Sequence, residues 1–369
     1  MADRQGPPPR RVLISCLRLL GDVVLSLPLL DMVKAEHPNC EVDYLVPAGM
    51  GDFLKCDPRV RRVIEHVRGG PSYLPRILGR YDWAFSTNGS DRGVISVTVA
   101  GSRKRLALVD TRLPFLKRWK QFALTHAVPM PQQRPVISWC TALARAAGLN
   151  PVRCHAEVYR NPSHESMVDR FLGRAGALAR PYLVVHPFSR YAYKQWDMER
   201  VARASDAIAE RHGLVPIWTG SGAASERTQI EAVAARTRHR PVLCLGDLDL
   251  NALTCLIARS RLYIGMDTAI THLAATTLTP IVALYGPTPT VYWSPWNNRS
   301  PVDQAFPTSP GSFRNGHISV LQDAEAFQRE HSPDMAMDRP SQAMAAITVE
   351  QVVAEADHLL ATPFLHLTP

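Results

Sequence analysis

The chain contains 369 residues, of which 46% are hydrophobic and 20% are charged, a composition typical of a globular protein with about two domains. No apolar run approaches the roughly 18 residues that a membrane-spanning helix needs, and the N-terminus lacks the apolar core of a signal peptide, so we expect a cytoplasmic protein. Seven scattered cysteines without a CxxC pair argue against a disulfide framework and against a zinc site.

The positive charge is concentrated in the first half of the chain. Residues 1–180 carry 27 Lys and Arg against 15 Asp and Glu, whereas residues 181–369 carry 15 against 18. A basic half indicates an anionic partner, such as an acidic substrate, a membrane surface or nucleic acid. Nucleic acid is the weakest of these, because the sequence has no recognised nucleic-acid-binding motif and no dense basic run.

Apolar strands alternate with helices in the first half. The pattern predicts strands at residues 11–17, 41–47, 81–86 and 104–110, and helices at 21–38 and 136–148. A mixed basic and aromatic segment, 111–135, interrupts the alternation. Such βα alternation is typical of a parallel, doubly wound sheet.

The alternation restarts in the second half and is more regular there. We expect strands at 181–187, 214–220, 241–246, 261–266 and 280–286, and helices at 198–213, 225–238, 250–260 and 269–277. Residues 297–344 are turn-rich and predict irregular loops around one candidate strand, 317–322, before a final helix with Thr348 as its N-cap. These patterns divide the chain into a domain at 1–175, a domain at 176–347 and a C-terminal helix and tail at 348–369.

Glycines and hydroxyl residues follow most of the predicted strands of the second half. Ligands of open α/β sheets bind beyond the carboxyl ends of the strands, and glycine lets an anion approach backbone amides. These ends favour a phosphate-bearing ligand, although ordinary βα turns remain an alternative. The sequence has neither GxGxxG nor GxxxxGK[ST], so it does not support a Rossmann dehydrogenase or a P-loop NTPase.

Two acidic positions each have two interpretations. Asp22 follows the first strand and a glycine, so it is either a helix N-cap or a carboxylate that takes a proton from a hydroxyl nucleophile. Asp249, in a DLD sequence, is similar to a metal-binding DxD, but an N-cap explains it without any ligand. We therefore predict no metal site.

Three segments together resemble the ADP-heptose:lipopolysaccharide heptosyltransferases of glycosyltransferase family 9. They are LRLLGDVVLSLP, KQWDMERVARASDAI and YIGMDTAITHLAATTLTPIVALYGPT, and the resemblance runs in order from Arg11 to about Trp296. The sequence GPTPTVYWSPW is most similar to the heptosyltransferase III branch. The resemblance implies a GT-B fold, in which two Rossmann-like domains face each other across a cleft, the first binding the lipid-linked acceptor and the second ADP-heptose.

The resemblance also implies roles for individual residues. Asp22 corresponds to the family's general base, in an RxGD-type motif. The sequence here has one more residue between Arg18 and Gly21 than that motif, so the correspondence extends to Asp22 more directly than to Arg18. The donor would contact residues of the second domain: Ser189, Lys194, Glu226, Asp267, Thr268, Ala269 and His272. Asp267 would cap the helix or accept from sugar hydroxyls, because a carboxylate repels phosphate. The acceptor would meet basic residues of the first domain: Arg18, Arg103, Arg105 and Lys120.

The expected reaction is a direct, inverting displacement without metal or cofactor, in which ADP leaves and Asp22 takes the acceptor proton. The partners implied are ADP-heptose, a lipid A-core acceptor and, through the basic clusters, the cytoplasmic face of the inner membrane. A GT-B transferase for another nucleotide sugar, a nucleotide-sugar epimerase and a non-catalytic nucleotide-sugar or core-binding protein remain alternatives.

Overall fold

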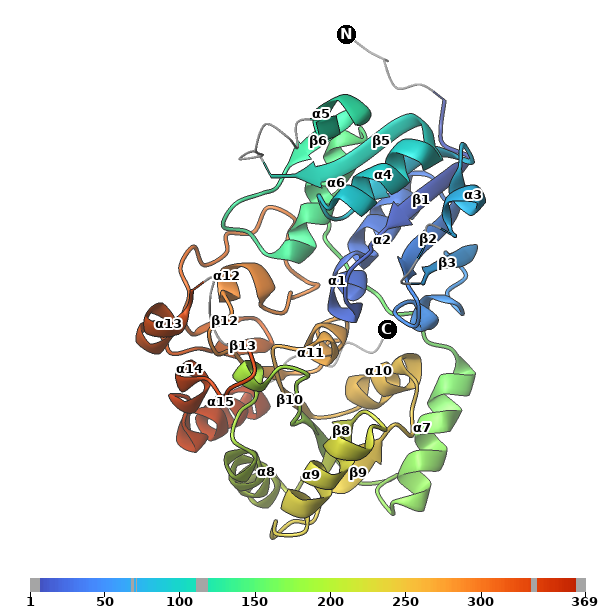
Figure 1. The fold of residues 1–369 in the computed structure, drawn as a ribbon. Helices are drawn as coiled ribbons and strands as arrows, with labels where there is room; N and C mark the ends of the chain where they lie inside the picture. Colours follow the sequence, from blue (N-terminus) through green and yellow to red (C-terminus); the bar gives the residue numbers. More distant parts are fainter. Residues whose placement is uncertain (1–6, 68–69, 71, 111–118, 333–336, 363–369) are drawn as a thin grey trace. The chain divides into compact units, whose positions relative to one another are not determined.

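The chain forms two compact units in the computed structural model, which describes residues 7–67, 70, 72–110, 119–332 and 337–362 (Figure 1). The first unit comprises Met1–Tyr159 with Asn298–Ala305, and the second comprises Arg160–Asn297 with Phe306–Pro369. The division therefore falls before the expected boundary at 175/176, because helix α7 (Pro162–Arg174) packs against α10 (Leu250–Ala258) of the second unit.

A six-stranded parallel sheet forms the centre of the first unit, in the order β3-β2-β1-β4-β5-β6. The strands are β1 (Arg11–Ser15), β2 (Glu41–Pro47), β3 (Arg62–His66), β4 (Tyr81–Ser86), β5 (Gly101–Val109) and β6 (His126–Pro129). This is the strand order of a Rossmann-like sheet. Strand β1 is buried from Val12 to Ser15, as expected for a strand with both faces covered.

Helices cover both faces of this sheet. Helix α4 packs on β1, β4 and β5, helix α6 packs on β5 and β6, and α2 packs against α6. The helices in the described part of the first unit are α1 (Leu20–Leu25), α2 (Leu27–Glu36), η1 (Asp52–Leu54), α3 (Leu74–Ile77), α4 (Asp91–Ala100), α5 (Trp119–Ala123), η3 (Val136–Ser138) and α6 (Trp139–Ala146). The single helix expected at 21–38 is two helices, because Pro28 lacks the amide hydrogen that a continuous helix would need. Ser26 lies at the junction, and its hydroxyl donates to the Val23 carbonyl of α1 at 2.7 Å.

The second unit is built around a seven-stranded sheet in the order β12-β13-β11-β10-β7-β8-β9, which is parallel except for the edge strand β12. Its strands are β7 (Tyr182–His186), β8 (Val215–Gly220), β9 (Val242–Leu245), β10 (Leu262–Met266), β11 (Ile281–Leu284), β12 (Phe313–Asn315) and β13 (Ile318–Leu321). The neighbouring strands β7 and β10 pair with Gly265 opposite His186, so the segments that follow them begin side by side.

One large apolar cluster joins the second sheet to helices α8 (Met198–His212), α9 (Ala224–Ala234) and α15 (Val349–Ala361). The C-terminal helix α15 packs on α8 and is therefore part of this unit, and Thr348 is its N-cap as expected. The remaining helices are η4 (Ala192–Lys194), α11 (Ala269–Ala274), α12 (Thr290–Trp293), α13 (Ala324–Glu330) and α14 (Gln342–Ala345). Residues 297–344 are thus less irregular than expected, since they contain β12, β13, α13 and α14.

None of the helices in the described parts of the chain combines the length and the apolar character needed to cross a membrane.

A buried carboxylate on β2 bonds both to the residue that precedes β3 and to the first residue of β4. Asp43 on β2 is 1% exposed and accepts two hydrogen bonds from the Arg61 guanidinium, at 2.9 and 2.5 Å, and one from the Tyr81 hydroxyl at 2.7 Å. All of these donors would lose their acceptor together if the carboxylate were removed.

We therefore predict that Asp43→Ala lowers the free energy of unfolding by about 3 kcal/mol, because it leaves the Tyr81 hydroxyl and part of a guanidinium buried without an acceptor. Urea unfolding at neutral pH measures this. Asp52→Ala is the matched control: Asp52 pairs with Lys55 at 2.5 Å, but both side chains are more than half exposed, so we expect a loss below about 1 kcal/mol. Equal losses in the two variants would contradict the structural role of Asp43.

Candidate active site

Asp22 lies in the first turn of α1, just beyond the carboxyl end of β1. Leu19 is the N-cap, and its amide donates to the Asp22 carboxylate with an N···Oδ2 distance of 3.2 Å. Arg18 Nε lies 3.8 Å from the other carboxylate oxygen. Asp22 is therefore not the N-cap itself, but its carboxylate is oriented by the start of the helix. The side chain remains 16% exposed, so it can be reached from outside.

A pocket of the first unit includes Asp22. Apolar side chains and the Thr87 hydroxyl line it, and its full lining is Asp22, Leu25, Ser26, Thr87, Leu108, Val136, Trp139, Cys140 and Leu143. Burial, and next the charge of Asp22, raise the pKa of the nearby Cys16 thiol to about 12. The Cys16 thiol therefore stays neutral at physiological pH. The Asp22 carboxylate thus lies beside side chains that are mostly apolar, together with the hydroxyl of Thr87.

The basic residues predicted to contact an acceptor differ in whether their side chains are exposed or already bonded within the first unit. Arg18 has a side chain that is 57% exposed. Arg103, in contrast, donates to the Pro7 carbonyl at 2.6 Å and lies 3.2 Å from Asp82, and Arg105 donates to the Ala123 carbonyl at 3.0 Å. The guanidinium groups of Arg103 and Arg105 therefore hold segments of the first unit together.

Lys120 is a buried structural cation. Its side chain is 3% exposed, and the ammonium pairs with Asp91 at 2.6 Å and donates to the Gly89 carbonyl at 2.5 Å. Both partners lie at the start of α4, so Lys120 fixes α5 to that helix. A contact with an acceptor does not fit this position, and the basic segment before it, 111–118, lies outside the described residues.

In the second unit, the segment after β7 is anchored at both ends. The Gln195 side chain donates to the Ser189 carbonyl at 2.6 Å, which closes the loop that carries Lys194. The indole of Trp196 then donates to the Ile347 carbonyl at 3.0 Å, and the Trp196 amide lies 3.1 Å from the sulfur of Met266 at the end of β10. These contacts hold the loop against the end of β10.

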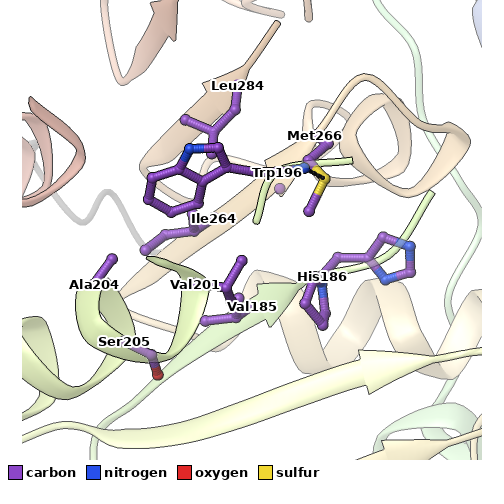
Figure 2. Close-up of a pocket in the computed structure, with 11 residues that line it drawn as sticks. Val185, His186, Trp196, Val201, Ala204, Ser205, Ile264, Met266 and Leu284 are labelled. Carbon is purple, nitrogen blue, oxygen red and sulfur yellow. Dashed lines mark hydrogen bonds between the residues drawn. The ribbon is translucent and has the colours of Figure 1, made fainter. Parts of the chain in front are cut away.

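A small cavity is lined in part by residues of this loop. Figure 2 shows the Trp196 indole next to Ile264 and Leu284, with Met266 and His186 toward the ends of their strands. The lining is mainly apolar: Val185, His186, Pro187, Trp196, Val201, Ala204, Ser205, Ile264, Gly265, Met266 and Leu284. We interpret this cavity as part of the packing that supports the loop.

Lys194 and Asp267 form a nearly buried ion pair. The ammonium lies 2.5 Å from Asp267 Oδ2, and the side chains are 18% and 6% exposed. Burial acts to lower the pKa of Lys194, but the adjacent negative charge of Asp267 raises it overall. Lys194 is therefore a fixed cation at neutral pH. The expectation that Asp267 caps the next helix is wrong, because its carboxylate pairs with Lys194 and the N-cap of α11 is Thr268.

The start of α11 presents a hydroxyl and an amide next to that pair. The Thr268 side chain makes no hydrogen bond to the backbone of the helix that it caps, and Ala269 is the first helical residue. One turn later, His272 is 5% exposed, and burial lowers its pKa to about 4. At neutral pH the His272 imidazole is therefore uncharged and can donate one hydrogen bond but no positive charge.

Two further positions have structural partners. Glu226 is 9% exposed and accepts from the Ser221 amide at 2.8 Å and from the Ser221 hydroxyl at 2.5 Å, so it stabilises the turn after β8. Asp249 accepts from the Ala252 amide at 2.8 Å, which confirms the N-cap interpretation. Among the residues that the structure describes, no group of three or more His, Cys, Asp or Glu side chains is placed to hold a metal ion.

Three residues near these side chains are not predicted from the sequence. Thr87 and Trp139 share the pocket of Asp22, and Tyr193 contacts Lys194. Thr87 directly follows a predicted strand, and that position could have identified it as a candidate site residue. The other two have no comparable signal, because an aromatic residue in a helix or a loop is usually part of the core.

We predict that acid destabilises the fold through His272 and His186. Both imidazoles are uncharged, with pKa values lowered to about 4 by removal from water, while the unfolded values are near 6.5. His272 is buried and His186 is partly buried. Unfolding therefore takes up protons below pH 6.5, and each histidine reduces the free energy of unfolding by about 1.4 kcal/mol per pH unit as the pH falls toward 4. Urea unfolding between pH 7 and 4.5 measures the total.

Imidazole NMR provides the residue-level check of that prediction. The His272 resonances should keep the chemical shifts of the neutral form at pH 5.5. Titration of His272 near pH 6.5 in the folded protein would contradict the prediction.

Comparison with known proteins places these features in a family. The model of glycosyltransferase family 9 (heptosyltransferase) matches residues 78–307. Lipopolysaccharide heptosyltransferase 3 of Escherichia coli is 23% identical to the chain over 292 residues, which cover 76% of this chain and 85% of that protein. This similarity confirms the expected resemblance to the heptosyltransferase III branch.

Solved structures show the same fold. A glycosyltransferase family 9 protein from Veillonella parvula superposes with a TM-score of 0.75 at 18% identity, over 95% of this chain and 97% of that one. Heptosyltransferase WaaC of E. coli, solved with ADP, gives 0.69 at 16% identity, over 95% and 99%. These likenesses confirm the GT-B fold class. Because the family model matches more than half of the 369 residues of this chain, the chain belongs to glycosyltransferase family 9, the heptosyltransferase family.

Proposed function

We propose that the protein transfers heptose from ADP-heptose to a sugar hydroxyl of the lipopolysaccharide inner core. The donor binds the second unit and the acceptor the first. The observation that carries this proposal is the fixed cation of Lys194 beside the start of α11, which suits a diphosphate. The solved relative WaaC has been determined with ADP and with ADP-2-deoxy-2-fluoro heptose, and a relative is named for transfer to lipopolysaccharide, which supports this choice of substrates.

Asp22 is the general base of the proposed reaction. The acceptor oxygen forms a bond to the anomeric carbon of heptose while the bond from that carbon to the ADP oxygen breaks. Asp22 takes the hydroxyl proton, and ADP leaves with the bonding electron pair. Attack from the side opposite to ADP inverts the anomeric configuration. The apolar wall beside Asp22 excludes water that would otherwise compete as the nucleophile.

Positive charge for the leaving diphosphate comes from Lys194 in this proposal, and neither a metal ion nor a cofactor takes part. Thr268, the Ala269 amide and neutral His272 add hydrogen bonds, which stabilise the negative charge that develops on ADP. Ser189 lies on the same anchored loop as Lys194. Its buried hydroxyl, which accepts from the Tyr191 amide at 3.4 Å in the free protein, contributes a further hydrogen bond. Asp267 contacts the cation and not the phosphate.

The remaining predicted residues have narrower roles. Glu226 acts on the nucleoside only by shaping the turn that contains Ser221. Arg18 is the cation best placed to meet an anionic group of the acceptor, because it is exposed beside Asp22. The acceptor does not contact Arg103, Arg105 or Lys120 in the proposed complex, because these side chains hold the first unit together.

We predict that the purified protein converts ADP-heptose to ADP in the presence of a matching truncated lipopolysaccharide core, and that EDTA has no effect. Asp22→Asn should lower turnover by about 10²–10⁴-fold, because an amide cannot accept the proton, while ADP still binds. Chromatographic detection of ADP and of the extended core, over a panel of core acceptors, measures turnover, and calorimetry measures ADP binding.

Asp52→Asn is the matched control, since Asp52 is an exposed acid of the same unit outside the pocket of Asp22. Turnover only with another nucleotide sugar would overturn the choice of donor. Binding of ADP-heptose without turnover on any acceptor would indicate a non-catalytic binding protein, and inhibition by EDTA would overturn the metal-free reaction.

We also propose that the first unit contacts the cytoplasmic face of a membrane through α5. Lys120 anchors this short helix internally, while Phe122 is 86% exposed and Trp119 is 38% exposed. Aromatic side chains on a basic half of a protein are suited to the interface of an anionic bilayer. A lipid-linked acceptor would then be met at the surface where it resides.

Phe122→Ser should reduce sedimentation of the protein with vesicles of mixed neutral and anionic phospholipids by about threefold or more, because an aromatic anchor is lost from the interface. Leu78→Ser is the control, because Leu78 is 64% exposed elsewhere in the same unit. Equal binding of the wild type and Phe122→Ser would rule out α5 as the contact.

A further inference from the structure

Tyr193 immediately precedes Lys194 and contacts its ammonium. The Lys194 Nζ atom lies 5.6 Å from the centre of the Tyr193 ring, within the range of a cation–π contact. The Tyr193 ring also lies 5.8 Å from the ring of Tyr191, on the same loop. The ammonium therefore has a carboxylate partner, Asp267, and an aromatic partner that no comparison or motif assigns a role.

The position of Tyr193 is not that of an ordinary core residue. Its side chain is only partly buried, and it lies on the short η4 turn rather than in the apolar cluster of the second unit. The anchors of the loop, namely Gln195 to Ser189 and Trp196 to Ile347, do not involve the Tyr193 side chain. Removing its hydroxyl should therefore leave the path of the loop unchanged.

A lysine side chain has many rotamers, and its ammonium can point in several directions unless neighbours restrict it. With Asp267 as its only partner, the Lys194 ammonium would be held by an ion pair at the end of β10. A second contact, with the ring of Tyr193 on the loop itself, further restricts where the ammonium can lie. Such preorganisation improves binding, because less freedom is lost when the ligand arrives.

We propose that Tyr193 is a positioning residue that, together with Asp267, holds the Lys194 ammonium where it meets the diphosphate of the donor. This inference rests on the proposed function, because it assumes that Lys194 contacts the donor. Tyr193 itself need not touch the substrate. It acts through Lys194, so its effect on donor binding must depend on the presence of that lysine.

A double-mutant cycle tests this dependence. The variants are Tyr193→Phe, which removes only the hydroxyl, Tyr193→Leu, which also removes the ring, Lys194→Met, and the two double variants. Tyr191→Phe is the matched control, since it removes a tyrosine hydroxyl from the same loop. Calorimetry measures the dissociation constant of ADP, and steady-state kinetics measure KM for ADP-heptose and for the acceptor separately. Thermal unfolding shows whether each variant is folded.

We expect Tyr193→Leu to weaken ADP binding about tenfold or more, with a parallel rise in KM for ADP-heptose and no change in KM for the acceptor, because the ring contact is lost. Tyr193→Phe keeps the ring and should bind ADP within about twofold of the wild type. Tyr191→Phe should bind ADP like the wild type. In the Lys194→Met background, the substitutions of Tyr193 should have no further effect on ADP binding, because the group they position is absent.

The outcomes separate this inference from the proposed function. If the wild type binds ADP and Tyr193→Phe and Tyr193→Leu bind it equally well, the role of Tyr193 is overturned and the donor site stands. If the substitutions of Tyr193 weaken ADP binding as much in the Lys194→Met background as in the wild-type background, Tyr193 acts on the ligand or the fold directly, which also overturns the inference. A wild-type protein that does not bind ADP overturns the proposed function.

Discussion

The ion pair between Lys194 and Asp267 is the interaction on which the candidate donor site depends. A lysine that is mostly removed from water would lose its proton or turn toward solvent without an opposite charge nearby. Asp267 prevents both, at a distance of 2.5 Å. The partners come from segments after β7 and β10, which are adjacent parallel strands, so the sheet itself brings the opposite charges together. The pair therefore joins the two segments that follow these strands.

This pair also determines what the neighbouring groups can do. Burial lowers the pKa of His272, and the charge of Asp267, which acts to raise that pKa, is opposed by the charge of Lys194. The site thus contains the Lys194 cation with its Asp267 counter-ion, the neutral imidazole of His272 and the first residues of α11. In the proposed reaction, a diphosphate shares the Lys194 ammonium with Asp267, and hydrogen bonds from uncharged groups supply the rest of the stabilisation.

Much of the fold can be predicted from the sequence because the central strands are continuous apolar runs, as in β1, β7, β10 and β11. Strand β6 (His126–Pro129) escapes prediction, since it is short, lies at the edge and contains a histidine and a proline. Strand β3 (Arg62–His66) escapes it for a similar reason, as two of its five residues are charged. Pro28 signals the break between α1 and α2, but the amphipathic pattern on both sides of it favours one helix.

The candidate site shows the same limit at the level of side chains. The ends of parallel strands meet at one edge of a sheet, so Lys194, Thr268 and His272 could be predicted to lie together. Their partners could not, because the path of the Lys194 loop depends on Trp196 bonding to Ile347, far away in the sequence.

Net charge is a similarly weak guide to location. The first half of the chain has many more cations than anions, yet the ammonium of Lys120 is inside the unit and the guanidinium groups of Arg103 and Arg105 bind backbone carbonyls. An excess of basic residues thus predicts an anionic partner only through those that stay exposed, and beside Asp22 that residue is Arg18.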